Sequence, residues 1–170
     1  MGLHGNRHGG CGTARSSVCL AAVSAMLLSG CHGSRDPGVS VGSRGLRFTK
    51  GDAFYVEELW STRKFQCFYG SLAVLGDHVY GSSGSSTAPL MAAINARTGE
   101  LAWRTRGFAL SNVVGVGNRL VVFDEDGKLT LATPAPDGLT IQAEAQVLRG
   151  TSLTPPTVQG KIIFVRDLTS

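Results

Sequence analysis

Three short segments of similar pattern recur at nearly constant spacing, and this period constrains the fold more than any other feature of the sequence. Each segment has apolar residues on both sides of a turn-forming pair that contains glycine; the segments are 74–80, 115–121 and 157–163. We align Val79, Leu120 and Ile162 as equivalent positions, 41 and 42 residues apart. A four-stranded blade of a β-propeller occupies about 40–45 residues. The period therefore predicts propeller blades in preference to a β-sandwich, the alternative all-β architecture.

Short apolar runs separated by turns fill the chain beyond residue 45. Pairs such as Gly51-Asp52 and Gly117-Asn118 mark hairpin turns because glycine, asparagine and aspartate tolerate positive φ. Glycine supplies 23 of the 170 residues, and no helical periodicity is present beyond the N-terminal segment. The predicted strands are Leu46–Lys50, Phe54–Trp60, Ser71–Leu75, His78–Ser82, Leu90–Asn95, Leu101–Arg104, Val113–Val116, Arg119–Phe123, Lys128–Thr133, 139–148, 157–158 and Lys161–Arg166.

These strands predict an all-β fold of about three four-stranded antiparallel blades over residues 46–170. Propellers usually close with about 4–8 blades, so we expect an incomplete propeller. Three interpretations stay open: a truncated or split gene product, several chains that assemble into a ring, or a complete open stack of sheets. Because an open propeller leaves strand edges unprotected, the first interpretation is favoured.

The N-terminal segment has the pattern of an export signal. Basic residues precede an eleven-residue apolar run over 18–28, which is too short to span a bilayer. The run ends in Leu-Ser-Gly followed by Cys31, which resembles the lipobox of bacterial lipoproteins. We therefore predict a lipoprotein-type signal peptide over 1–30, lipidation of Cys31 and a flexible tether over 31–45. An ordinary cleaved signal peptide is the alternative.

The segment Ala93-Ile-Asn-Ala-Arg-Thr-Gly-Glu-Leu-Ala-Trp103 resembles the repeat of PQQ-type β-propellers, whose pattern is Ala-x-Asp-x-x-Thr-Gly-x-x-x-Trp. Asn95 stands where the family usually has aspartate. The resemblance implies that Thr98 and Gly99 turn the chain between two outer strands. It also implies that Trp103 docks against the neighbouring blade, with Trp60 as a second docking candidate. This pattern marks blade structure and not a quinone site.

The sequence contains no recognisable catalytic, cofactor-binding or metal-binding motif. With Cys11 and Cys19 in the predicted signal and Cys31 lipidated, Cys67 is the one remaining cysteine, and we interpret it as a small apolar residue of the core. The acidic run 124–126 is interpreted as a solvated hairpin turn. The net charge of +4 is not clustered, so no nucleic-acid-binding surface is expected.

The lipobox and the blade pattern together resemble outer-membrane assembly lipoproteins of the BamB type, which do not use PQQ. The resemblance implies a non-enzymatic binding or scaffold protein of the bacterial envelope, exported to the periplasm and tethered to a membrane through Cys31. We expect another envelope protein as its partner, no cofactor, and a homo-oligomer if several copies close a ring. The alternative is a fragment of a PQQ-dependent alcohol or sugar dehydrogenase whose active site lies in missing blades.

Overall fold

Two four-stranded antiparallel sheets form the centre of the computed structural model, which describes residues 20–21, 42–85 and 87–168. In both sheets the strands follow each other in chain order. The first contains β4 (Ala73–Leu75), β5 (His78–Ser85), β6 (Ala88–Asn95) and β7 (Leu101–Thr105). The second contains β8 (Ser111–Val116), β9 (Arg119–Asp124), β10 (Lys128–Ala135) and β11 (Gly138–Gln146). The predicted all-β class and the four-stranded antiparallel blades are confirmed.

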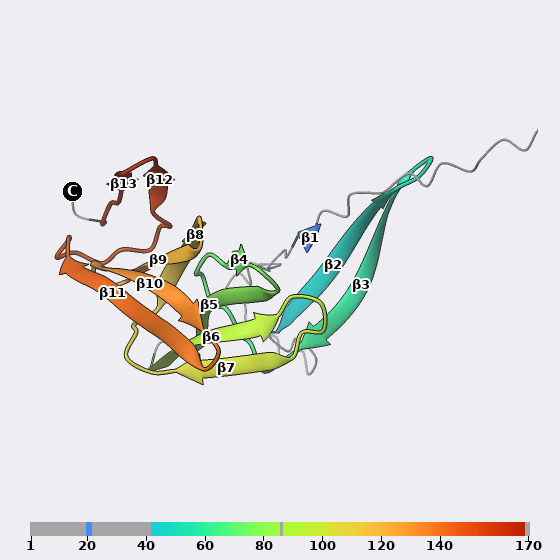
Figure 1. The fold of residues 1–170 in the computed structure, drawn as a ribbon, viewed down its shortest axis with the longest axis horizontal. Coiled ribbons are helices and arrows are strands. Elements are labelled where there is room, and N and C mark those ends of the chain that lie inside the picture. Colours follow the sequence, from blue (N-terminus) through green and yellow to red (C-terminus); the bar gives the residue numbers. More distant parts are fainter. Residues whose placement is uncertain (1–19, 22–41, 86, 169–170) are drawn as a thin grey trace, which may run out of the picture.

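A two-stranded hairpin lies at each end of this pair of sheets (Figure 1). Strands β2 (Ser43–Lys50) and β3 (Phe54–Thr62) form the first, and β12 (Thr157–Gln159) and β13 (Ile162–Phe164) form the second. The short strand β1 (Leu20–Ala21) pairs with the outer edge of β2. All twelve predicted strands therefore form, but they make two complete blades and two hairpins. Strand β2 begins at Ser43, which lies within the segment 31–45 that we predicted as a tether, so strand pairing starts earlier than expected.

The predicted alignment of the third repeat is wrong by one residue. Glycine occupies the first position of the turn in each repeated hairpin, with φ of 60° at Gly76, 60° at Gly117 and 59° at Gly160. Left-handed φ values of this kind are costly for residues with a side chain, so these glycines define equivalent positions. Ile163, and not Ile162, is therefore the equivalent of Val79 and Leu120. The corrected spacings are 41 and 43 residues.

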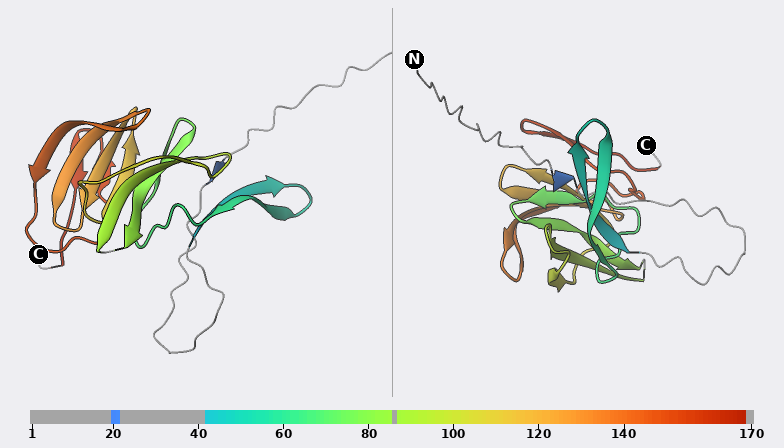
Figure 2. Two further views of the ribbon diagram at one scale, coloured as in Figure 1. Left: turned by 90° about the horizontal axis from the view of Figure 1, so that it is seen from below. Right: turned by 90° about the vertical axis from the view of Figure 1, so that its right-hand side faces the viewer.

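The two complete sheets stack face to face and enclose the main core (Figure 2). This cluster of buried side chains comprises Ala73, Tyr80, Met91, Ala93, Trp103, Phe108, Val113, Leu120 and Val122. Polar contacts also join the sheets where they meet. The Ser71 hydroxyl donates to the carbonyl of Val113 at 3.0 Å, and the Ser71 amide donates to the side-chain oxygen of Asn112 at 2.8 Å. The packing is that of consecutive blades.

The opposite face of the first sheet carries a second, smaller core. Phe65, Val79, Ala92, Ile94 and Ala96 are buried in it, with Trp60 packed against the cluster. Phe65 lies in the segment that connects the hairpin β2–β3 to β4, and its carbonyl accepts a hydrogen bond from the Ser43 hydroxyl at 2.9 Å. The base of the hairpin is therefore attached to the first sheet, while its tip extends away from both sheets (Figure 2). No described helix is long and apolar enough to cross a membrane.

Candidate docking site around the Thr98–Gly99 turn

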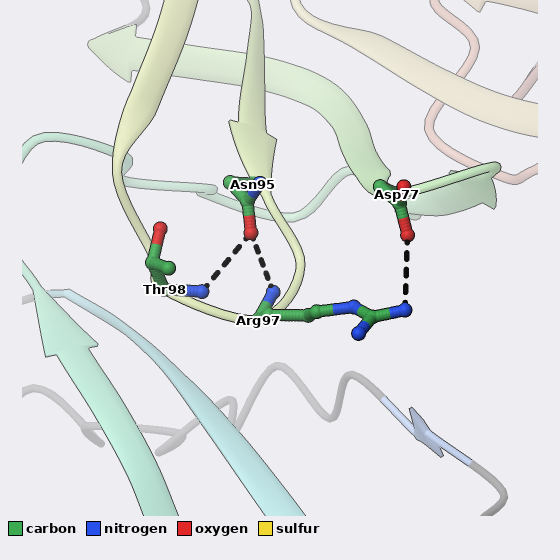
Figure 3. A network of polar contacts seen from close by, with 4 residues as sticks. All are labelled: Asp77, Asn95, Arg97 and Thr98. Atoms are coloured by element: carbon green, nitrogen blue, oxygen red, sulfur yellow. Dashed lines mark hydrogen bonds and ion pairs between the residues drawn. The ribbon is translucent and has the colours of Figure 1, made fainter.

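Asn95 organises the turn between β6 and β7 (Figure 3). Its side-chain oxygen accepts hydrogen bonds from the amides of Arg97 at 2.8 Å and Thr98 at 3.1 Å. The Gly99 amide donates to the Asn95 carbonyl at 2.9 Å, which closes the turn. An aspartate carboxylate can accept the same two bonds, so asparagine replaces the usual family residue without loss of the turn geometry.

This turn is also attached to the neighbouring hairpin of its own sheet. The amide of Ala96 donates to the carbonyl of Asp77 at 2.8 Å, and the Arg97 guanidinium lies 3.4 Å from the Asp77 carboxylate. Both charged side chains are largely exposed, so the ion pair adds little stability. The backbone bond is the stronger constraint, because it holds the β4–β5 turn beside the β6–β7 turn.

The indole of Trp60 lies directly on Gly99. A Cβ atom added to Gly99 would lie 2.6 Å from the Trp60 ring, and Gly99 has a φ of +71°. The indole nitrogen donates to the carbonyl of Ala96 at 2.9 Å. Gly45, the cross-strand neighbour of Trp60, is the second glycine at which a Cβ would collide with the ring. The indole therefore fits between the backbone at Gly45 and the backbone at Gly99, because a side chain at either position would collide with the ring.

Ala93 and Trp103, the first and last residues of the predicted motif, face the other side of the sheet. They are cross-strand partners on β6 and β7, and both are buried in the main core. The Trp103 ring lies 6.0 Å from the Tyr80 ring in a tilted arrangement. Trp103 also lines an open pocket of about 230 Å³ between the two sheets, together with His78, Tyr80, Pro134, Ala135 and Pro136.

The predicted motif therefore serves two interfaces at once. Asn95, Thr98 and Gly99 form a turn that contacts the indole of the preceding hairpin, whereas Ala93 and Trp103 pack toward the following sheet. Trp60 precedes Trp103 by 43 residues, which is one blade period. This spacing of one blade period is the sequence signal that predicts a contact between Trp60 and the turn.

The Asn95 side chain allows a direct test of the turn. We expect Asn95→Asp to leave the free energy of unfolding almost unchanged, because both hydrogen bonds are kept. Asn95→Leu removes the acceptor of two amide hydrogen bonds at an exposed site, and we expect a loss of about 1–2 kcal/mol. Urea denaturation followed by circular dichroism measures both. Equal losses in the two variants would contradict this role for the side-chain oxygen.

A second polar contact between the sheets was not visible in the sequence. The hydroxyl of Tyr69 donates to the Glu125 carboxylate at 2.6 Å, across 56 residues of sequence. Burial and the adjacent carboxylate raise the pKa of Tyr69 well above its ordinary value, so the hydroxyl stays a donor. The Asp124 side chain accepts the Lys128 amide at 2.9 Å, and burial raises the Asp124 pKa. Glu125 and Asp126 form the hairpin turn, as expected, but Asp124 is the last residue of β9 and is buried, so the acidic run is not solvated throughout.

Cys67 is half-buried and forms part of the packing beside the first sheet. Its thiol donates to the carbonyl of Gly70 at 3.0 Å. Burial raises the pKa of the thiol to about 11, with that hydrogen bond opposing the shift. A thiol of this kind carries little thiolate at neutral pH, and the thiolate is the reactive form. Cys67 is therefore an unreactive packing residue, as expected, but it is only half-buried and lies outside both clusters of buried apolar side chains, so it is not the core residue that we predicted.

The raised pKa makes Cys67 slow to alkylate in the folded chain. At pH 9, the ordinary pKa of a cysteine, we expect roughly fiftyfold less thiolate than in the urea-unfolded chain. Peptide mass spectrometry after timed iodoacetamide treatment measures the rate at this residue alone. Because folding raises the thiol pKa, its contribution to stability is complete below about pH 9 and is lost as pH rises through 11. Equal alkylation rates in folded and unfolded chains would contradict this.

The other predicted functional residue, Cys31, lies outside the described residues, as does almost all of the predicted signal peptide over 1–30. Its lipidation therefore stays a prediction. Within residues 42–85 and 87–168, no group of three or more His, Cys, Asp or Glu side chains is placed to hold a metal ion.

The family described as outer membrane protein assembly factor BamB matches residues 13–135. The chain belongs to this family. The matched range includes Trp60, the 93–103 motif and the strands as far as Ala135, which is the last residue of β10. Both the docking turn and the indole that contacts it therefore lie within the BamB family match. The predicted resemblance to PQQ-like propeller repeats is confirmed.

A BamB structure shows the same fold. The crystal structure of BamB from Moraxella catarrhalis superposes with a TM-score of 0.50 at 21% sequence identity, and the match covers 76% of this chain. The chain spans only 38% of the length of that protein. In total 23 chains of solved structures match, and comparison with curated proteins found no significant match. At this identity the similarity is evidence for the fold alone.

Proposed function

We propose that this chain is a non-enzymatic scaffold of the bacterial envelope, which holds another envelope protein on its propeller blades. The observation that carries the proposal is the BamB family match over residues 13–135, a range that includes the first sheet and three strands of the second. As the name of the family says, BamB is an outer membrane protein assembly factor. A rigid stack of sheets suits such a role because it offers a fixed surface and free strand edges.

The outer edge of the second sheet is the surface best suited to a protein partner. Strand β11 has nine residues and is the last strand in its sheet, so one side of its backbone faces away from the ladder. Its residues from 140 to 146 are all exposed, and Ile141 keeps 49% of its surface accessible. An extended segment of a partner can add to such an edge through main-chain hydrogen bonds. We propose β11 as the strand that recruits it.

The proposed location rests on the signal pattern over 1–30 and on Cys31. A lipid on Cys31 would hold the blades close to a membrane surface, because the segment between Cys31 and the first strand of the hairpin at Ser43 is short. In this position the chain acts as a tethered binding surface for a protein in the same membrane.

The test is chemical crosslinking of intact cells of a bacterium with an outer membrane that expresses the full chain. The chain is then purified and its partners are identified by mass spectrometry. We expect one or a few envelope proteins to be enriched over a chain with Thr140→Pro and Gln142→Pro, which block the β11 edge. The matched control is Thr49→Pro on β2, away from that edge.

Recovery of the same proteins with the β11 variant would show that this edge is not the binding surface. Recovery of no envelope protein at all would overturn the scaffold proposal. Cys31→Ser separates the anchor from the binding surface, because we expect it to release the chain from the membrane fraction and leave the β11 edge intact. Membrane retention of that variant would contradict the lipid anchor.

A further inference from the structure

The open pocket between the two complete sheets has an aromatic wall and a proline wall. His78 and Tyr80 on β5 and Trp103 on β7 form the aromatic wall. Residues 134–136, at the end of β10 and in the turn that follows, form the other. Two of these three residues are prolines, whose φ is fixed by the ring, so this wall is rigid before any ligand arrives. Both walls belong to complete blades.

The three rings form a continuous surface that is not flat. The ring centres of His78 and Tyr80 lie 6.2 Å apart, and those of Tyr80 and Trp103 lie 6.0 Å apart. The successive ring planes are tilted by 47° and 48°. Ala93 lies between Tyr80 and Trp103 in the same cross-strand row. Because a larger side chain at residue 93 would separate the two rings, the alanine makes the aromatic surface continuous.

Two hydrogen-bond donors on this surface have no acceptor. Tyr80 and Trp103 keep only 5% and 8% of their surface exposed. In the part of the chain that the structure describes, neither the Tyr80 hydroxyl nor the Trp103 indole N–H forms a hydrogen bond, yet neither polar atom is fully enclosed. Burial raises the pKa of Tyr80, so its hydroxyl stays protonated. Since buried tyrosine and tryptophan side chains usually find an acceptor, these two donors are available to a ligand.

The lining limits the chemistry of that ligand. Among the described residues, no lysine, arginine, aspartate or glutamate lines the pocket, so a charged ligand would lose its hydration without gaining an ion pair. The volume of about 230 Å³ is below the roughly 300–1,000 Å³ of small-molecule sites. The pocket therefore suits one or two uncharged residues of a longer chain, with acceptors for the two donors and apolar surface for the rings.

A proline-containing segment in the polyproline II conformation meets each of these requirements. Its backbone carbonyls have no internal hydrogen bonds and can accept from the tyrosine and the tryptophan. Its proline rings are apolar, and proline has no amide N–H that would need an acceptor inside the pocket. Aromatic-lined grooves are a general means of binding such segments, which are already extended before they bind.

We propose that this pocket binds an uncharged, proline-containing segment of another protein. Tyr80 and Trp103 donate hydrogen bonds to its backbone carbonyls, and the aromatic wall packs against its proline rings. This inference goes beyond the proposed scaffold function and does not depend on the β11 edge, because no residue of β11 lines the pocket.

The test is an NMR titration of the isotope-labelled full chain with the peptide acetyl-Ala-Pro-Pro-Ala-Pro-Pro-Ala-amide. We expect a saturable shift of the Trp103 indole N–H signal. The Trp60 indole signal should stay in place, because that indole donates to Ala96 outside the pocket, and Trp60→Phe assigns the two signals. A control peptide with alanine at every proline should bind about tenfold more weakly, because it must be ordered on binding and brings unpaired amides.

Tyr80→Phe removes the unpaired hydroxyl and keeps the ring. We expect the dissociation constant of the proline peptide to rise about fivefold to tenfold, the equivalent of one hydrogen bond. Urea denaturation should show no loss of stability, because this hydroxyl has no partner in the chain without ligand. Tyr69→Phe is the matched control. Its hydroxyl is bonded to Glu125 outside the pocket, so this variant should lose stability and keep its affinity for the peptide.

Three results would overturn the proposal. The first is a titration in which the Trp103 signal does not move or moves without saturation. The second is equal affinity for the proline peptide and the alanine peptide, because the pocket would then not select proline. The third is unchanged affinity in Tyr80→Phe, because the hydroxyl would then make no bond to the peptide.

Discussion

Gly99→Val is expected to destabilise the chain by about 3–4 kcal/mol. Two costs add at this position. A residue with a side chain at a φ of +71° lowers the free energy of unfolding by about 1–2 kcal/mol, because the left-handed conformation is unfavourable. Its Cβ would also lie 2.6 Å from the Trp60 ring. The indole must then leave the turn, with loss of its hydrogen bond to the Ala96 carbonyl. Urea denaturation followed by circular dichroism measures the loss.

Gly76→Val is the matched control for this substitution. Gly76 has nearly the same backbone conformation, with a φ of +60°, but a Cβ added there meets nothing within 4 Å. We expect only the conformational cost of about 1–2 kcal/mol. The difference between the two variants therefore isolates the contact with Trp60. Equal losses at the two glycines would mean that the indole does not pack on the turn.

Trp60→Ala has the second large effect, because it removes the contact between the hairpin β2–β3 and the first sheet. The ring packs against the smaller core, and its nitrogen makes a hydrogen bond of 2.9 Å. Since the side chain is only half-buried, we expect a loss of about 2–3 kcal/mol, below the range for a fully buried tryptophan. Limited proteolysis should cut within β2–β3 much sooner than in the wild type.

Trp60→Phe separates the two contributions of this side chain. Phenylalanine keeps most of the apolar contact with Gly45 and Gly99 but cannot donate to the Ala96 carbonyl. We expect a loss of about 1 kcal/mol, the usual net value of one hydrogen bond. If Trp60→Phe and Trp60→Ala were equally destabilising, the ring contact would contribute nothing.

The local elements could be predicted from the sequence because their signals are local. Turn pairs with glycine limit each strand to a few residues, and twelve of the thirteen described strands were found in this way, the two-residue strand β1 being the exception. The error of one residue in the third repeat arose because apolar residues were aligned. Ile162 and Ile163 are both apolar, so hydrophobicity cannot tell them apart, whereas Gly160 at a φ of 59° identifies the turn.

The division of the strands among sheets could not be predicted, because it depends on contacts between distant residues. Only the spacing of 43 residues to Trp103 indicates that the indole of Trp60 meets the turn at Gly99, and nothing near Tyr69 in the sequence indicates its hydrogen bond to Glu125. The same holds for the hairpins β2–β3 and β12–β13, neither of which belongs to a four-stranded sheet. A strand of three residues such as β12 has the same local pattern whether its sheet has two strands or four. Side-chain packing between blades determines how many strands join each sheet and which distant residues meet.

The hairpin β2–β3 and the two sheets stack as consecutive parts of a propeller, with the indole of Trp60 on the Thr98–Gly99 turn. Nuclear Overhauser spectroscopy of the isotope-labelled full chain tests it most directly. We predict strong cross-peaks between the Trp60 ring protons and the α protons of Gly99. We also predict slow solvent exchange of the indole proton that donates to Ala96. Rapid solvent exchange of the Trp60 indole N–H proton, together with no cross-peak between the ring and Gly99, would contradict the stacked arrangement.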